Sequence, residues 1–289
     1  MISIGSQYSR GFTRANPSCY LFLIDQSLGM GEPIEGNGPR RCDFLADRVN
    51  NWLNEMILRA STENSVRGFL EIAVIGYHTD EQGNPIIQSA LPGDRFIPIS
   101  QIALNTLRID EKQMRIYDEE IADVQEFSVQ IPVWIDPVAR GGSPMCAALC
   151  DAYYRLESWI ANHPYSFPPI VIHITEGEAQ DGDPVEFAEP LRSLSTCHGE
   201  LLLFNFCTSA GADEKTLFPS RLESHSNRQA IDLFNLSSLL PAPFYERAAR
   251  EHALHPGARA FAYGADVVTL NQFLEVSSPP FIARHRPLR

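Results

Sequence analysis

Short apolar runs alternate with longer amphipathic stretches along most of this chain. Apolar runs bounded by polar or breaker residues predict strands buried on both faces, as in parallel sheets; these are 20–24, 68–77, 169–174 and 200–206. Stretches with apolar residues every three or four positions predict helices; these are 42–59, 145–162 and 184–194. Strands that alternate with helices in this way predict an α/β fold, a doubly wound and mostly parallel sheet flanked by helices.

Two of the helices have a well-defined apolar stripe. The stripe of 42–59 consists of Leu45, Val49, Trp52, Leu53, Met56 and Ile57, and that of 145–162 consists of Met145, Leu149, Ala152, Leu156, Trp159 and Ile160. The second helix follows a Gly-Gly-Ser-Pro segment, in which Ser143 has the chemistry of an N-cap and Pro144 suits the first helical position.

The remaining segments give weaker signals. Residues 86–90 and 96–99 predict short extended pieces at the sheet edge, and 131–135 predicts a short edge element because it contains Pro132. The charged stretch 101–130 is compatible with a helix or with a surface excursion. Beyond Cys207 the pattern predicts a short strand within 215–221 and helices at 227–240, 242–252 and 266–273.

These elements suggest how the chain is organised. We expect a lead-in over residues 1–16, a sheet domain over 17–225, and a helical C-terminal extension over 226–289 that packs on the same domain. The last residues, FIARHRPLR, are basic and apolar together. They fit a solvated tail or a docking tail for an acidic partner.

Oxygen-bearing side chains follow the predicted strands. Asp25 and Ser27 come directly after the strand at 20–24, Ser143 precedes a helix, and Glu176 follows the strand at 169–174. The carboxyl ends of parallel strands meet at one edge of a sheet, where open α/β folds place their ligands. Carboxylate and hydroxyl oxygens suit a hard divalent cation such as Mg²⁺.

The order of these segments resembles the von Willebrand factor A (VWA) family and its metal-ion-dependent adhesion site. That family reads D-x-S-x-S after the first strand, then a Thr before a helix, then an Asp after a later strand. Here Asp25 and Ser27 match, whereas Gly29, Ser143 and Glu176 replace a Ser, the Thr and the Asp.

The resemblance implies a role for each of these residues. Asp25, Ser27 and Ser143 would coordinate the ion or lie next to its ligands, and Glu176 would act directly or through water. A water or a backbone carbonyl would replace the oxygen missing at Gly29. The alternative is a degenerate site, in which Asp25 caps backbone N–H groups and Ser143 is only an N-cap.

The resemblance also implies a non-catalytic module that binds a protein partner through this site. Within the family the chain is similar to stand-alone bacterial intracellular members, including those like the tellurite-resistance TerY proteins. Such relatives are associated with kinases and phosphatases, so the resemblance implies partners of these classes.

Two enzymatic hypotheses are alternatives to the non-catalytic binding module. Ser27 lies in a Ser-x-Gly half of a nucleophile elbow, which would suit a serine hydrolase, but Asp25 stands where the elbow has its first glycine. For such an enzyme His78 and His198 are candidate bases, whereas His173 inside a strand predicts a satisfied core histidine. The other reading is a metal-dependent phosphohydrolase or nuclease, and the lack of a second clear carboxylate pair argues against it.

An acidic cluster lies beside Glu176, and two cysteines share one face of a predicted helix. Glu178, Asp181 and Asp183 could bind a second cation or form a polar loop, and the loop is favoured because EF-hand spacing is lacking. Cys146 and Cys150 lie four residues apart, which favours packing over a metal or redox role.

Composition bears on partners and compartment. The 289 residues carry a formal net charge of −13, which disfavours nucleic acid as a partner. The N-terminal residues lack the apolar core of a signal peptide, and the apolar runs are too short to cross a membrane. We therefore expect no membrane association. The six cysteines show no C-x-x-C pair, and we expect a cytoplasmic, reducing environment.

Overall fold

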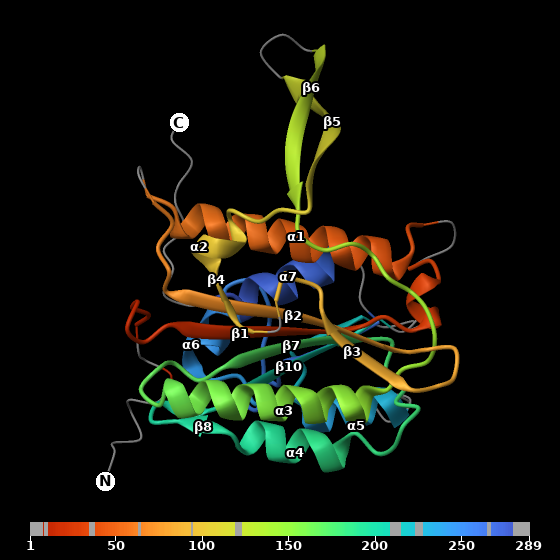
Figure 1. Ribbon diagram of the computed structural model, residues 1–289, viewed down its shortest axis with the longest axis vertical. Helices are drawn as coiled ribbons and strands as arrows, with labels where there is room; N and C mark the ends of the chain where they lie inside the picture. The colour runs from red at the N-terminus through yellow and green to blue at the C-terminus, as the bar shows by residue number, and fades with distance from the viewer. Residues whose placement is uncertain are drawn as a thin grey trace.

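A mostly parallel β-sheet runs through the middle of the molecule, with helices on both faces (Figure 1). The computed structural model describes residues 8, 11–34, 38–62, 65–93, 95–118, 123–208, 215–222, 228–264 and 267–279. Within them, the strands of the sheet are β1 (Ser18–Asp25), β2 (Leu70–Thr79), β3 (Pro85–Ser89), β4 (Ile97–Pro98), β7 (Ile170–Thr175), β10 (Leu202–Cys207), β11 (Thr216–Leu217) and β12 (Phe261–Tyr263).

The strand order is β11-β12-β10-β7-β1-β2-β3, with β4 also paired to β2. Strands β2, β1, β7, β10 and β12 run parallel to their neighbours in this series, whereas the edge strands β3, β4 and β11 pair antiparallel. The predicted α/β class with a mostly parallel central sheet is therefore confirmed. A separate antiparallel pair is formed by β8 (Ser195–Thr196) and β9 (Gly199–Glu200).

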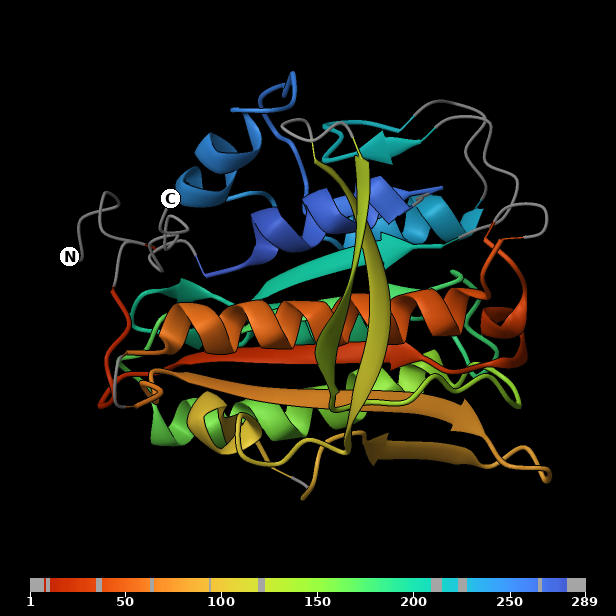
Figure 2. The same ribbon diagram turned by 90° about the horizontal axis from the view of Figure 1, so that it is seen from above.

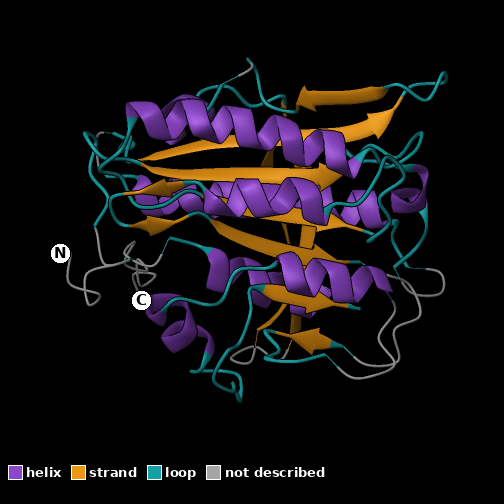
Figure 3. Cartoon of the chain, turned by 90° about the horizontal axis from the view of Figure 1, so that it is seen from below, coloured by secondary structure: helices purple, strands orange, loops and turns teal. Residues whose placement is uncertain are grey.

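Side chains of β1 alternate between two apolar layers. Tyr20, Phe22 and Ile24 belong to the layer that also contains residues of α1 (Arg41–Ala60), α2 (Ile99–Ile102), α6 (Ala242–Ala248) and α7 (Val267–Ser277). Cys19 and Leu21 belong to the layer shared with α3 (Met145–Asn162), α4 (Val185–Ser193) and α5 (Arg228–Leu236). Because both faces of β1 are covered, the whole strand is buried. Figure 3 shows helices lying over the strands when the molecule is seen from below.

The predicted helix stripes pack into these layers. All six stripe residues of α1 are buried, and so are those of α3 except Ile160, which is partly buried. The helices expected at 184–194, 227–240, 242–252 and 266–273 correspond to α4, α5, α6 and α7, although α5 and α6 end several residues earlier than predicted.

The charged stretch 101–130 is not a long helix. Most of it belongs to an antiparallel hairpin of β5 (Arg108–Asp118) and β6 (Asp123–Val133), which projects from the side of the molecule that carries α1 (Figures 1 and 2). Residues 131–133, predicted as part of a short edge element, are the end of β6, where Pro132 faces Ile109. Lys112 of β5 lies 3.5 Å from Asp47 of α1 and connects the base of the hairpin to the body.

The C-terminal region adds a strand that the sequence did not predict. Strand β12 pairs parallel with β10, with Asn205 opposite Phe261, and it brings residues beyond 226 into the central sheet. The region is therefore helical only in part. The predicted domain boundaries near residues 16 and 225 stay predictions. Within the described residues, no helix combines the length and the apolar character needed to span a membrane.

Candidate functional site

Asp25 is the centre of a hydrogen-bonded group at the carboxyl edge of the sheet. It is the last residue of β1, beside Thr175 at the end of the neighbouring parallel strand β7, and it is 1% exposed. Its Oδ1 accepts the backbone N–H of Ser27 at 2.9 Å. Its Oδ2 accepts the hydroxyls of Thr175 at 2.9 Å and of Ser143 at 3.0 Å. Three distant segments thus meet at one carboxylate.

Ser143 takes part in this group and not in capping α3. Its hydroxyl donates to Asp25, and the residue preceding α3, Pro144, makes no side-chain capping hydrogen bond. The prediction of Ser143 as the N-cap is therefore wrong. Asp181 caps the helix from a distant loop, because its two carboxylate oxygens accept the N–H groups of Cys146 at 3.0 Å and Ala147 at 2.9 Å.

Glu176 follows β7 and folds back over the loop after β1. Its Oε1 accepts the hydroxyl of Ser27 at 3.2 Å. Its Oε2 lies 3.4 Å from Nη1 of Arg41, the first residue of α1, and the same nitrogen donates to the carbonyl of Gly29 at 2.8 Å. All four predicted site residues therefore lie together, since Asp25 contacts Ser27 and Ser143 while Glu176 contacts Ser27. The family resemblance did not point to Arg41 or Thr175.

The group is shielded from water to different degrees. Asp25, Ser27 and Ser143 are buried, whereas the Glu176 side chain is 22% exposed. Burial raises the pKa of Asp25, and the hydrogen bonds from Ser27, Thr175 and Ser143 oppose that rise. Burial also raises the pKa of Glu176, with a further contribution from the nearby Asp25 charge, while Ser27 and Arg41 act in the opposite direction.

The oxygen donors suit a divalent cation in kind. Asp25 and Glu176 offer carboxylates and Ser27 and Ser143 offer hydroxyls, which are the ligands that Mg²⁺ accepts. Both hydroxyls donate their hydrogens to carboxylates, so their lone pairs are available. Across the described part of the chain, no group of three or more His, Cys, Asp or Glu side chains is placed to hold a metal ion. A metal here would therefore depend on hydroxyl or backbone oxygens as well as carboxylates.

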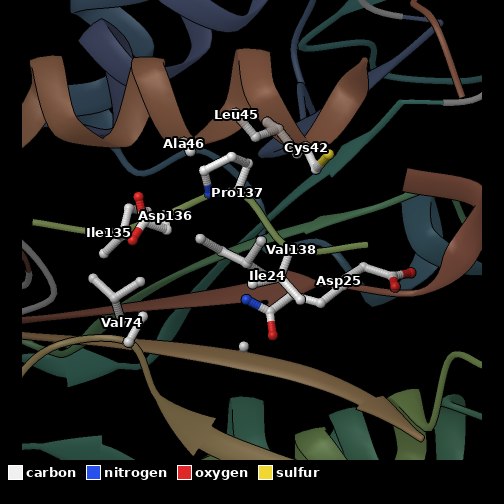
Figure 4. A pocket seen from close by; sticks show the side chains of 13 residues that line it. Ile24, Asp25, Cys42, Leu45, Ala46, Val74, Ile135, Asp136, Pro137 and Val138 are labelled. Carbon is white, nitrogen blue, oxygen red and sulfur yellow. The ribbon is translucent and has the colours of Figure 1, made fainter. Parts of the chain in front are cut away.

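A small cavity lies next to Asp25 beneath the loop 135–138. Its volume is about 20 Å³, enough for a single water molecule. Figure 4 shows Ile24 and Val138 lining it, with the Asp25 carboxylate directed away from it. Gln26 also lines the cavity, and its buried Oε1 has no hydrogen-bond partner among the described residues. The cavity is too small for an organic ligand.

The histidines take different positions. His173 is buried in β7, where Nε2 lies 2.8 Å from the Tyr77 hydroxyl and Nδ1 lies 2.8 Å from Oδ1 of Asn205. The prediction of a satisfied core histidine is confirmed. His78 is buried, and its Nδ1 has no hydrogen-bond partner within the described residues. The His198 backbone N–H donates to the Thr196 hydroxyl at 3.2 Å.

The acidic loop after Glu176 serves to start helices. Besides the Asp181 cap on α3, Asp183 accepts the N–H of Val185 at the beginning of α4 at 2.9 Å. These contacts agree with the predicted polar loop. Cys146 is buried with a pKa raised to about 12, because burial and the charge of Asp181 disfavour its thiolate. Packing is therefore the role that the structure supports for this cysteine.

No family model and no curated protein matches the chain. Similar solved structures include the vWF domain of the type V pili tip protein Mfa5 from Porphyromonas gingivalis (14% identity, TM-score 0.30, covering 57% of this chain and 39% of that one). They also include the PilB minor pilin from Streptococcus sanguinis (13%, 0.34, 58% and 31%) and the human COPII-coat protein Sec24c (10%, 0.29, 69% and 28%). The chain thus spans less than two fifths of each of these proteins. The fold class rests on the strand order and register of the chain itself.

Proposed function

We propose that this chain is a non-catalytic protein-interaction module that docks a partner at the carboxyl edge of its sheet, around Asp25, Ser27, Ser143 and Glu176. The observation that carries the proposal is the convergence of three distant segments on the Asp25 carboxylate. A network of this kind fixes the loops that present the edge to solvent. Leu28, 66% exposed and next to Ser27, is an apolar side chain that these loops present to solvent, where a partner could contact it.

Mg²⁺ is part of this proposal. Asp25, Ser27, Ser143 and Glu176 would hold the ion. The bound ion would supply a positive charge that accepts a carboxylate oxygen from the partner. The TerY-like resemblance adds the finer expectation of a kinase or phosphatase partner in the cytoplasm.

The surroundings of Ser27 favour docking over hydrolysis. Its hydroxyl donates to the Glu176 carboxylate, and Asp25 accepts its backbone N–H. Two carboxylates beside the hydroxyl disfavour the negative charge that a serine nucleophile develops. Labelling of Ser27 by a fluorophosphonate probe would support the hydrolase instead.

A pull-down with matched variants of the full chain tests the docking surface. Leu28→Glu places a charge beside the site, whereas Leu58→Glu changes a leucine of similar exposure (61%) near the other end of α1, the helix that begins at the site. We expect proteins captured by the wild type and by Leu58→Glu to be lost with Leu28→Glu, as read by quantitative mass spectrometry. Equal capture by the two variants would exclude docking at this edge. Equal capture by the wild type in Mg²⁺ and in EDTA would exclude a metal bridge to the partner but would leave docking at this edge in place.

A further inference from the structure

Arg41 is a buried cation at the site that neither the motif nor the resemblance points to. It is 5% exposed, and its Nη1 reaches both the Gly29 carbonyl and Glu176 Oε2. Its Nε is buried and has no hydrogen-bond partner among the described residues. A guanidinium removed from water needs an anion nearby, and the Glu176 carboxylate is the anion paired with it here. The Arg41 guanidinium and the Glu176 carboxylate therefore stabilise each other's charge at this position.

Gly29 makes room for this pair. A Cβ at position 29 would lie 1.8 Å from Glu176 Oε2 and 2.2 Å from Oε1. The Glu176 carboxylate thus occupies the space that a side chain at position 29 would take. The two departures from the motif are complementary, because the absent side chain at Gly29 leaves room for the longer side chain of Glu176. In this position the carboxylate faces Arg41.

We propose that Arg41 is the built-in counter-cation of the site, and that a divalent cation must displace it from Glu176 in order to bind. The inference rests on the proposed function, because it concerns the same docking site. With Arg41 in place, the Asp25–Glu176 pair already has a positive charge beside it, which repels a second cation. Without that charge, two carboxylates and two hydroxyls converge with no cation among them, an arrangement that favours a divalent ion.

Titration of the full chain with Mn²⁺ by isothermal calorimetry tests this proposal. Arg41→Gln and Arg41→Met both remove the charge, and the Met side chain fills similar space without polar groups that need partners. Arg41→Lys retains the charge, and Arg48→Gln removes a different arginine of α1, which pairs with Asp47. We expect the two neutral variants of Arg41 to bind Mn²⁺ at least about tenfold more tightly than the wild type. Arg41→Lys and Arg48→Gln should bind Mn²⁺ with an affinity close to that of the wild type.

Circular dichroism shows which variants fold. If Arg41→Gln does not fold, Arg41→Met provides the neutral variant for the comparison. Equal or weaker Mn²⁺ binding by a folded neutral variant would overturn the counter-cation role, and so would the absence of binding in every protein. The pull-down tests the proposed docking function independently of the calorimetry. Tighter Mn²⁺ binding by the neutral variants, together with equal capture by Leu28→Glu and Leu58→Glu, would retain the counter-cation role and reject docking. Unchanged Mn²⁺ binding, together with loss of capture in Leu28→Glu alone, would reject the counter-cation role and retain docking.

Discussion

Protonation of His173 is expected to destabilise the fold in mild acid. Asn205 donates through its amide nitrogen to Leu233 and Ser237, so its oxygen faces His173 Nδ1. Nδ1 therefore carries the proton, and Nε2 accepts the Tyr77 hydroxyl. Burial lowers the pKa of His173 from 6.5 to about 4.

The sign of the effect follows from the two pKa values. Between pH 6.5 and about 4 the unfolded chain binds a proton at His173 that the folded chain does not. Stability is therefore fully present above pH 6.5 and is lost as the pH falls toward 4. A gap of about 2.5 pH units corresponds to a limit of about 3 kcal/mol, of which about 2 kcal/mol is lost on going from about pH 7.5 to about pH 5.

Urea unfolding of the wild type and of His173→Gln at both pH values measures this loss. The raised pKa values of Asp25 and Glu176 act in the opposite direction, because folded carboxyl groups of this kind bind protons more tightly than unfolded ones. Both proteins contain these carboxyl groups, so their effect cancels in the difference. We expect the wild type to lose about 2 kcal/mol more than the variant. Equal losses in the two proteins would refute a buried neutral His173.

Two further predictions concern packing and capping. Phe204→Ala should lower the free energy of unfolding in urea by about 3–5 kcal/mol, because its ring packs against aromatic rings of α6 and α7. The control Phe127→Ala, in the exposed hairpin, should change it by less than about 0.5 kcal/mol. Similar costs in the two variants would contradict the described packing of the C-terminal helices. Asp181→Ala should cost about 1 kcal/mol by removing the cap of α3. Asp181→Asn should cost less, because its single amide oxygen can still accept one of the two N–H groups. An unchanged melting temperature in Asp181→Ala would argue against the cap.

Local periodicity accounts for the parts of the structure that the sequence could predict. The stripes of α1 and α3 and the apolar run of β1 each lie within one short segment, and each needs only an apolar layer to pack against. The meeting of Asp25 and Glu176 was also predictable, because parallel strands end at a common edge. Ser143 was expected there because of the family resemblance. The sequence thus indicated the fold class and four of the residues at the site, whereas Thr175 and Arg41 were not predicted.

The features that depend on distant partners were decided only by the tertiary structure. Ser143 looks like an N-cap within its own segment, but Asp25 accepts its hydroxyl and Asp181 caps the helix in its place. The pattern of charges in 101–130 fits either a helix or a surface excursion, and strand pairing makes most of it a hairpin. Arg41 lies one residue before the helix predicted at 42–59, and no role was predicted for it from the sequence. Only the folded chain brings it beside Glu176, whose carboxylate occupies the space left by Gly29, because the start of α1 and the loop after β7 lie more than a hundred residues apart in the sequence.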